Sequence, residues 1–122
     1  MKNIFGEKLE CCCTNPLTGF YRDGFCRTDS FDAGTHVVCA IVTKEFLEFS
    51  LSKGNDLIKP KPHYNFPGLK PGNKWCLCAL RWKEAFEAGV APKVILEATA
   101  EDVLQYIDMQ DLISHAHKNE SI

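Results

Sequence analysis

The chain has 122 residues, of which 45% are hydrophobic and 25% are charged, and these values predict one ordinary globular domain. A chain of this length buries roughly two thirds of its unfolded surface, so a core can form without disulfides or metal. The formal net charge of −2 argues against a general nucleic-acid or membrane binder.

No segment of the sequence predicts export or membrane insertion. Residues 1–10 lack the apolar run of about 7–15 residues that a signal peptide requires. No stretch approaches the roughly 18 apolar residues of a membrane-spanning helix. We therefore expect a cytoplasmic protein whose seven cysteines stay thiols in a reducing compartment, and the odd count prevents a framework in which every cysteine is paired.

The first part of the chain predicts turns more than regular structure. Residues 1–10 are expected to form an irregular lead, and three adjacent cysteines, 11–13, precede Pro16, which favours an extended or turn backbone. Asp23-Gly24 suits a tight turn. Thr35–Thr43 is the best strand, because it is rich in β-branched residues and apolar on both faces, as a central strand is.

A helix and a long loop are predicted next. Lys44–Lys53 has helical apolar spacing, with Thr43 as its N-cap and Gly54 just past its end. The connection from Asn55 to Asn73 contains four prolines, which stiffen it. Loops this long are uncommon inside compact domains and are often functional.

Short strands and helices alternate in the remaining chain. Trp75–Cys78 is predicted to be extended, and Ala79–Ala88 to be a helix with one apolar face. Lys93–Ala98 is the second good strand. Thr99 opens a capping-box pattern for a short helix from Ala100 to about Leu104.

The last segment predicts a brief strand over 105–107, a helix from 108 to 117 and a frayed tail over 118–122. Three residues of that helix are expected to face inward: Leu112, Ile113 and Ala116. Few strands alternating irregularly with helices predict a small two-layer α+β domain over residues 1–122, with helices on one face of a mixed β-sheet and a long, ordered loop rich in Pro and Gly.

Several motifs resemble those of one known family, the bacterial and plant proteins catalogued as domain of unknown function 2237. The motifs are Asn15–Gly24, Thr35–Cys39, Gly54–Asp56 and the segment from Phe66 to Ala85. The resemblance runs from about Cys12 to Ala116 and implies a compact α+β domain without assigned catalytic residues. The family pattern has a single cysteine near Cys12, so Cys11 and Cys13 are not expected in a family-wide site.

Binding of an anionic ligand is the leading functional hypothesis. Seven basic residues against one acid, Asp56, lie between Lys53 and Lys83, although two solvated faces of opposite charge would give the same pattern. Arginine holds carboxylates or phosphates with two parallel hydrogen bonds and stacks on aromatic rings. We expect a pocket for a small anionic molecule or a protein segment. Its predicted residues are Arg22, Asp23, Tyr64, Phe66, Trp75 and Arg81.

A structural interpretation of the same residues stays open. Trp75 and Trp82 would then belong to the core, and Arg22 would pair with Asp23 or Asp56 to hold loops in place. A purely structural or interaction protein is therefore a further alternative, and whether the chain is an enzyme is left undecided. The sequence contains no nucleophile elbow, zinc-protease motif or phosphate-binding loop.

A cysteine-based metal or thiol-redox site is the main alternative, with Cys26, Cys39, Cys76 and Cys78 as its candidate residues. Thiolates are ligands for tetrahedral zinc, and Cys76 and Cys78 share a face of a strand. Cys78 at a helix start near Arg81 has surroundings that favour a thiolate, with Cys76 as resolving partner. His36 is expected to point away from Cys39, which counts against joint ligation. Packing as small hydrophobic residues is the competing interpretation for these cysteines.

Overall fold

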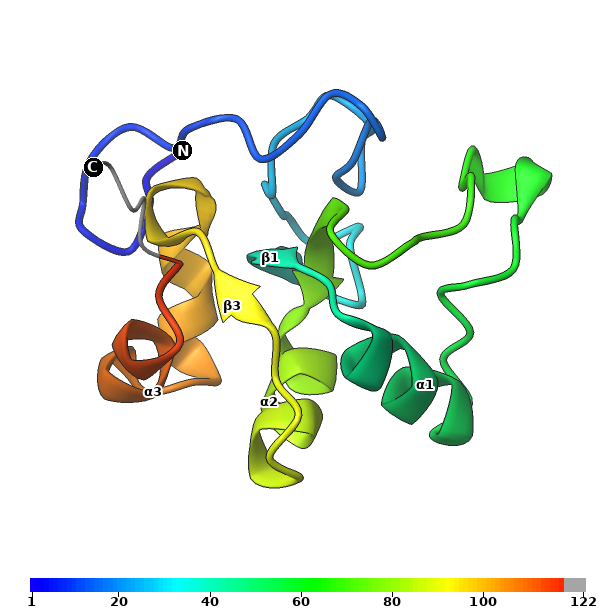
Figure 1. Ribbon diagram of the computed structural model, residues 1–122. Coiled ribbons are helices and arrows are strands. Elements are labelled where there is room, and N and C mark those ends of the chain that lie inside the picture. The colour runs from blue at the N-terminus through cyan, green and yellow to red at the C-terminus, as the bar shows by residue number, and fades with distance from the viewer. Residues whose placement is uncertain (118–122) are drawn as a thin grey trace, which may run out of the picture.

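The computed structural model describes residues 1–117, so the predicted frayed tail, 118–122, lies outside the described residues (Figure 1). The domain is α+β, as predicted. In chain order its elements are β1 (His36–Ile41), α1 (Lys44–Ser52), the 3₁₀ helix η1 (Pro62–Tyr64), β2 (Lys74–Cys78), α2 (Ala79–Glu87), β3 (Lys93–Val94), the 3₁₀ helices η2 (Leu96–Ala98) and η3 (Glu101–Gln105), and α3 (Met109–Ser114).

The sheet has the order β2-β1-β3, so β1 is central, as its apolar sequence predicts. Both pairings are antiparallel, whereas the sequence predicted a mixed sheet. The parallel contact between Val94 and Ala116 is an isolated bridge. In Figure 1, α1 and α2 lie on one side of these strands and the N-terminal segment passes on the other.

The main core forms where α1 and α2 meet the sheet. Phe46 of α1 and Trp82 of α2 are both completely buried in it, together with β1 residues such as Val38. The indole N–H of Trp82 donates to the carbonyl oxygen of Pro92 at 3.1 Å, so burial leaves this donor satisfied. Thr43 caps α1 as predicted, since its hydroxyl accepts the N–H of Phe46 at 3.1 Å.

The predicted strand Lys93–Ala98 is wrong beyond Val94, where the chain turns into η2. The Thr99 hydroxyl forms no capping box. It instead donates to the carbonyl oxygen of Ile95 at 2.9 Å and accepts the N–H of Cys39 at 3.2 Å. Tertiary contacts to β1 therefore override the local helix-start signal.

The C-terminal predictions are partly wrong. Residues 105–107 form no strand, because η3 extends through Gln105. Helix α3 ends at Ser114 because the following residues bond to β3: Val94 donates to His115, and His117 donates to Val94, each at 2.8 Å. Within α3, Leu112 is fully buried as predicted, but Ile113 is 50% exposed.

Residues 1–35 contain none of the helices and strands, yet they pack firmly against the rest of the domain. The buried Asn3 side chain accepts the N–H groups of Phe5 and Glu7 at 2.9 and 3.2 Å, and it donates to the carbonyl oxygen of Glu97 at 3.1 Å. Among the described residues, the helices are too short and too polar to cross a bilayer.

Candidate functional site

Four buried cysteines meet at the sheet. Two of them, Cys39 of β1 and Cys76 of β2, are direct partners across the strands. Their N–H groups donate elsewhere, to the hydroxyls of Thr99 at 3.2 Å and Thr18 at 2.8 Å. Cys39 and Cys76 therefore form a non-hydrogen-bonded pair, the arrangement that brings opposite side chains closest.

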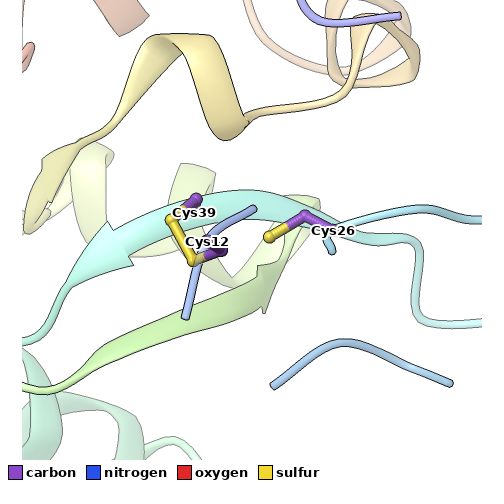
Figure 2. A group of neighbouring side chains, drawn as sticks. All are labelled: Cys12, Cys26 and Cys39. Carbon is purple, nitrogen blue, oxygen red and sulfur yellow. A yellow bond between two sulfur atoms is a disulfide. The ribbon is translucent and has the colours of Figure 1, made fainter. Parts of the chain in front are cut away.

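The N-terminal segment supplies the other two cysteines. Cys12 is bonded to Cys39 with an S–S distance of 2.04 Å, and Cys26 is bonded to Cys76 at 1.98 Å. Figure 2 shows the Cys12–Cys39 bond with the sulfur of Cys26 beside it, and these three sulfurs lie within 4.8 Å of one another. Each of the four residues is at most 5% exposed. We call these four residues the sulfur cluster.

The expectation that all cysteines are thiols is wrong for the sulfur cluster. The bonded residues are 27 and 50 positions apart, so no local spacing identifies the pairs. In a chain-entropy description, closing loops of this size stabilises the fold by about 3–5 kcal/mol each. The two bonds join a segment without helices or strands to the central strand β1 and the edge strand β2.

As thiols, the same four side chains have the donor chemistry of a metal site, because closed tetrahedral zinc sites take four thiolates. Three of the cysteines predicted for such a site, Cys26, Cys39 and Cys76, do come together. The fourth member of the cluster is Cys12, whereas the sequence suggested Cys78. Cys78 is a half-buried free thiol, and it does not pair with Cys76 because that residue is bonded to Cys26.

A cavity of about 610 Å³ adjoins the sulfur cluster and includes Cys76 in its lining. We call it the large cavity, although a more open hollow lined by Pro60 and Pro67 has a volume of about 1000 Å³. The large cavity is also lined by four of the predicted ligand-binding residues: Arg22, Tyr64, Phe66 and Trp75. Phe66 and Trp75 meet edge-to-face with ring centroids 5.1 Å apart. The long loop, β2 and the Arg22 turn thus come together around one space.

Arg22 braces the wall of the large cavity. Its backbone φ is +54°, and its guanidinium donates to the carbonyl oxygens of Gly19 at 2.5 Å, Tyr64 at 2.8 Å and Asn65 at 3.3 Å. The guanidinium carbon lies 5.0 Å from the centre of the Trp75 ring. Burial lowers the pKa of Arg22. A guanidinium has about five N–H donors, so roughly two remain beyond these three bonds.

Asp23 lies next to Arg22 in sequence but does not line the large cavity. Its carboxylate pairs with Arg27 at 2.6 Å and accepts the N–H of Phe25 at 3.1 Å. Burial acts to raise the pKa of Asp23, but the hydrogen bonds from Arg27 and Phe25 outweigh it and the pKa is lowered. The Asp23 carboxylate therefore stabilises the turn in which Asp23 itself lies.

The large cavity is lined mostly by aromatic and apolar side chains, with four basic groups among them. Besides Arg22 they are Lys61, His63 and His36, and among residues 1–117 the lining includes no carboxylate side chain. The Lys61 ammonium donates to the carbonyl oxygen of Asp56, and it lies 5.4 Å from the centre of the Phe66 ring. Positive charge and aromatic surface are thus combined in one hollow.

A second cavity of about 200 Å³ shares His36 with the large cavity, and we call it the small cavity. Arg81, which the sequence assigned to the same pocket as Arg22, lines the small cavity instead. Its guanidinium donates to the carbonyl oxygen of Lys53 and to Glu84, both at 3.3 Å. Cys78 also lines the small cavity.

A family model described as "Uncharacterized protein conserved in bacteria (DUF2237)" matches residues 2–116. The chain belongs to this family. No curated protein matches the chain. The sulfur cluster and both cavities therefore lie within the DUF2237 domain, and the family description assigns no activity to any of them.

Sequence reasoning missed an Asp-His pair in this DUF2237 domain. The Asp32 carboxylate lies 2.6 Å from His36 Nδ1, and the Asp32 side chain is completely buried while that of His36 is 36% exposed. Sequence reasoning considered His36 only as a partner for Cys39. The four-residue separation of Asp32 and His36 was the available signal, but it is common and carries little information without a fold.

Proposed function

We propose that the large cavity of this DUF2237 protein binds a small anionic molecule. The observation that supports this most directly is its lining of basic groups and aromatic rings without a carboxylate from the described residues. Its volume of about 610 Å³ falls in the range of roughly 300–1,000 Å³ that small-molecule sites occupy. We favour a free small molecule over an acidic protein segment for this reason.

The hydrogen bonds that hold the Arg22 guanidinium in place support the same proposal. Carbonyl oxygens hold the guanidinium against Trp75, so a ligand meets donors whose direction is already fixed. Preorganised donors bind more tightly because little side-chain freedom is lost on binding. Lys61 adds positive charge from the loop wall, and His63 adds a ring nitrogen that can donate a hydrogen bond. The exposed rings of Phe20 and Tyr64, which also line the cavity, suit a flat organic anion.

Titration with benzoate and with phenyl phosphate tests this proposal. We expect nuclear magnetic resonance shifts concentrated on Arg22, His63 and Trp75, and an affinity that falls as salt rises. The Lys61→Gln variant should weaken binding about threefold to tenfold, whereas Lys93→Gln, the same charge change on β3, should not. The proposal is wrong if neither anion binds, or if the two variants bind alike.

A second candidate function is zinc binding by the sulfur cluster. The supporting observation is the convergence of four buried cysteines, three of whose sulfurs lie within 4.8 Å of one another. Reduction of two disulfides needs four electrons and four protons, which two molecules of a dithiol supply. Zinc would then replace thiol protons. A cytoplasmic location, which the sequence predicts, favours the thiol state that this function requires.

Elemental analysis of protein purified with reductant and without chelator tests the second candidate. About one zinc per chain is expected. Cys12→Ser should lose the metal, whereas Cys13→Ser, the matched control at the adjacent position outside the cluster, should retain it. Metal-free protein, or equal zinc in the two variants, would rule the site out. The anion-binding proposal does not depend on the result.

A further inference from the structure

The Asp32–His36 pair has the geometry of an oriented general base. Asp32 Oδ1 lies 2.6 Å from His36 Nδ1, while Oδ2 accepts the backbone N–H of His36 at 2.8 Å and the hydroxyl of Thr28 at 3.0 Å. A carboxylate is an acceptor, so Nδ1 carries the proton in this bond. Nε2 is then left as the free acceptor of the imidazole.

The imidazole of His36 is fixed in position by more than this one bond. It packs against Gly34 so closely that a Cβ at that residue would lie 2.5 Å from its Cε1 atom. On another side it stacks on Phe20, with centroids 6.2 Å apart and an interplanar angle of 23°. Both cavities border the ring, so it is held rigidly where a ligand can reach it.

Cys78 is the residue directly opposite His36 on the neighbouring strand. In a regular antiparallel pair, directly opposite residues have Cβ atoms roughly 4.5–5.5 Å apart, with both side chains on the same face of the sheet. The pairing is irregular between His36 and Val38, and such bulges change the direction of a side chain. His36 and Cys78 also border the same small cavity.

The position of Cys78 at the start of α2 adds to this arrangement. Cys78 is the N-cap of the nine-residue helix, and its side chain accepts no capping hydrogen bond. The first N–H groups of a helix have no intrahelical partner, so they favour negative charge at this end. Arg81 contributes a further cation at the small cavity.

We propose that Cys78 is an acyl-transfer nucleophile, with His36 as its general base and Asp32 as a positioning residue. The substrate class is a small anionic ester or thioester, because Arg81 lines the small cavity and basic groups line the adjoining one. The triad logic of nucleophile, base and orienting carboxylate needs no particular sequence motif.

The reaction is balanced without a cofactor. As Cys78 Sγ attacks the carbonyl carbon, its proton passes to His36 Nε2. The bond from that carbon to the leaving oxygen or sulfur breaks, and the imidazolium returns the proton to the leaving group. Water, deprotonated by His36, then attacks the acylated Cys78, releasing the acid and restoring the thiol.

Acylation by p-nitrophenyl acetate tests the proposal in the intact disulfide-bonded protein. In a Cys11→Ser/Cys13→Ser background Cys78 is the remaining free thiol. In Cys13→Ser/Cys78→Ser the exposed Cys11 is the reference thiol. We expect Cys78 to be acetylated at least about tenfold faster than Cys11, with continued turnover. Slower acetylation of Cys78 than of Cys11 overturns the proposal, and this comparison needs no histidine variant.

Variants of the pair then test the assigned roles. His36→Gln should slow acetylation of Cys78 about tenfold or more, whereas His117→Gln, at an exposed position that lines neither cavity, should not. Asp32→Asn should slow it too and shift the nitrogen-15 resonances of His36 away from the Nδ1–H tautomer. Unchanged acetylation in folded His36→Gln protein, or unchanged His36 resonances in Asp32→Asn, would contradict the assignment. Anion binding to the large cavity is measured separately, so either proposal can fail alone.

Discussion

The guanidinium of Arg22 lies over the ring of Trp75, 5.0 Å from its centre, and joins the N-terminal segment to β2. The same group donates to carbonyl oxygens of the loop between α1 and β2, at Tyr64 and Asn65. Three segments far apart in the sequence therefore depend on one side chain. An arginine can do this because its planar fork presents several donors in fixed directions.

Replacement of Arg22 by lysine should destabilise the domain although the charge is kept. A lysine cannot reach three carbonyl oxygens in the same geometry, so at least one would lose its partner. We expect a loss of about 1–3 kcal/mol in the free energy of unfolding, measured by urea denaturation. Lys93→Arg is the control for a Lys/Arg exchange on the surface. If Arg22→Lys were as stable as the parent protein, the hydrogen bonds of Arg22 would contribute little to the free energy of unfolding.

Alanine at Gly34 should displace the imidazole of His36. The new Cβ would lie 2.5 Å from Cε1, and the ring cannot retreat without giving up the bond to Asp32. Overpacking of this kind costs about 1–3 kcal/mol. Denaturation measures that cost, and histidine resonances report the lost Asp32–His36 bond. Retention of the Nδ1–H tautomer in Gly34→Ala would contradict the described packing.

Thiol counting should distinguish the two states of the cysteines. In the disulfide state three of the seven cysteines, Cys11, Cys13 and Cys78, are free, so unfolded protein should react with three equivalents of a thiol reagent. Full reduction should raise the count to seven. Cys11→Ser should lower both counts by one. A count of seven without prior reduction would mean that the sulfur cluster exists as thiols.

Asp56 should contribute to acid sensitivity. Hydrogen bonds from the N–H groups of Lys59 and Ile58 lower the pKa of its carboxyl. Because the folded-state pKa lies below the unfolded value of about 3.9, its stabilising contribution is present above that pH. It is lost as pH falls through the folded-state value. Asp56→Asn should therefore flatten the pH dependence of stability below about pH 4, and an unchanged dependence would contradict this.

The elements that could be predicted are those whose pattern is local. The capped helix α1 and the apolar strand β1 lie where the sequence places them, because Thr43 supplies a cap and β-branched residues favour a buried strand. The end of α3 could not be predicted, because hydrogen bonds of Val94 with His115 and His117 replace the last helical turn. Long-range partners override local preference there.

The candidate sites show the same division. Aromatic and arginine residues pointed to the region of the large cavity, but the sequence could not separate Arg81 from Arg22, which border different hollows. The disulfide partner of Cys12 could not be predicted, because residues 1–35 have no hydrophobic periodicity from which their course in the fold could be inferred. The juxtaposition of His36 and Cys78 was overlooked for a related reason, since the two residues lie opposite each other only through strand pairing.

The bond between Cys26 and Cys76 also has a thermodynamic consequence for the large cavity. Cys26 follows the Arg22 turn closely in sequence, and Cys76 itself borders the cavity, so this bond fixes one wall against another. A ligand that binds the large cavity more tightly when this disulfide is intact must, by thermodynamic linkage, make the disulfide harder to reduce. Ligand binding to the large cavity and the oxidation state of Cys26 and Cys76 would then be thermodynamically coupled.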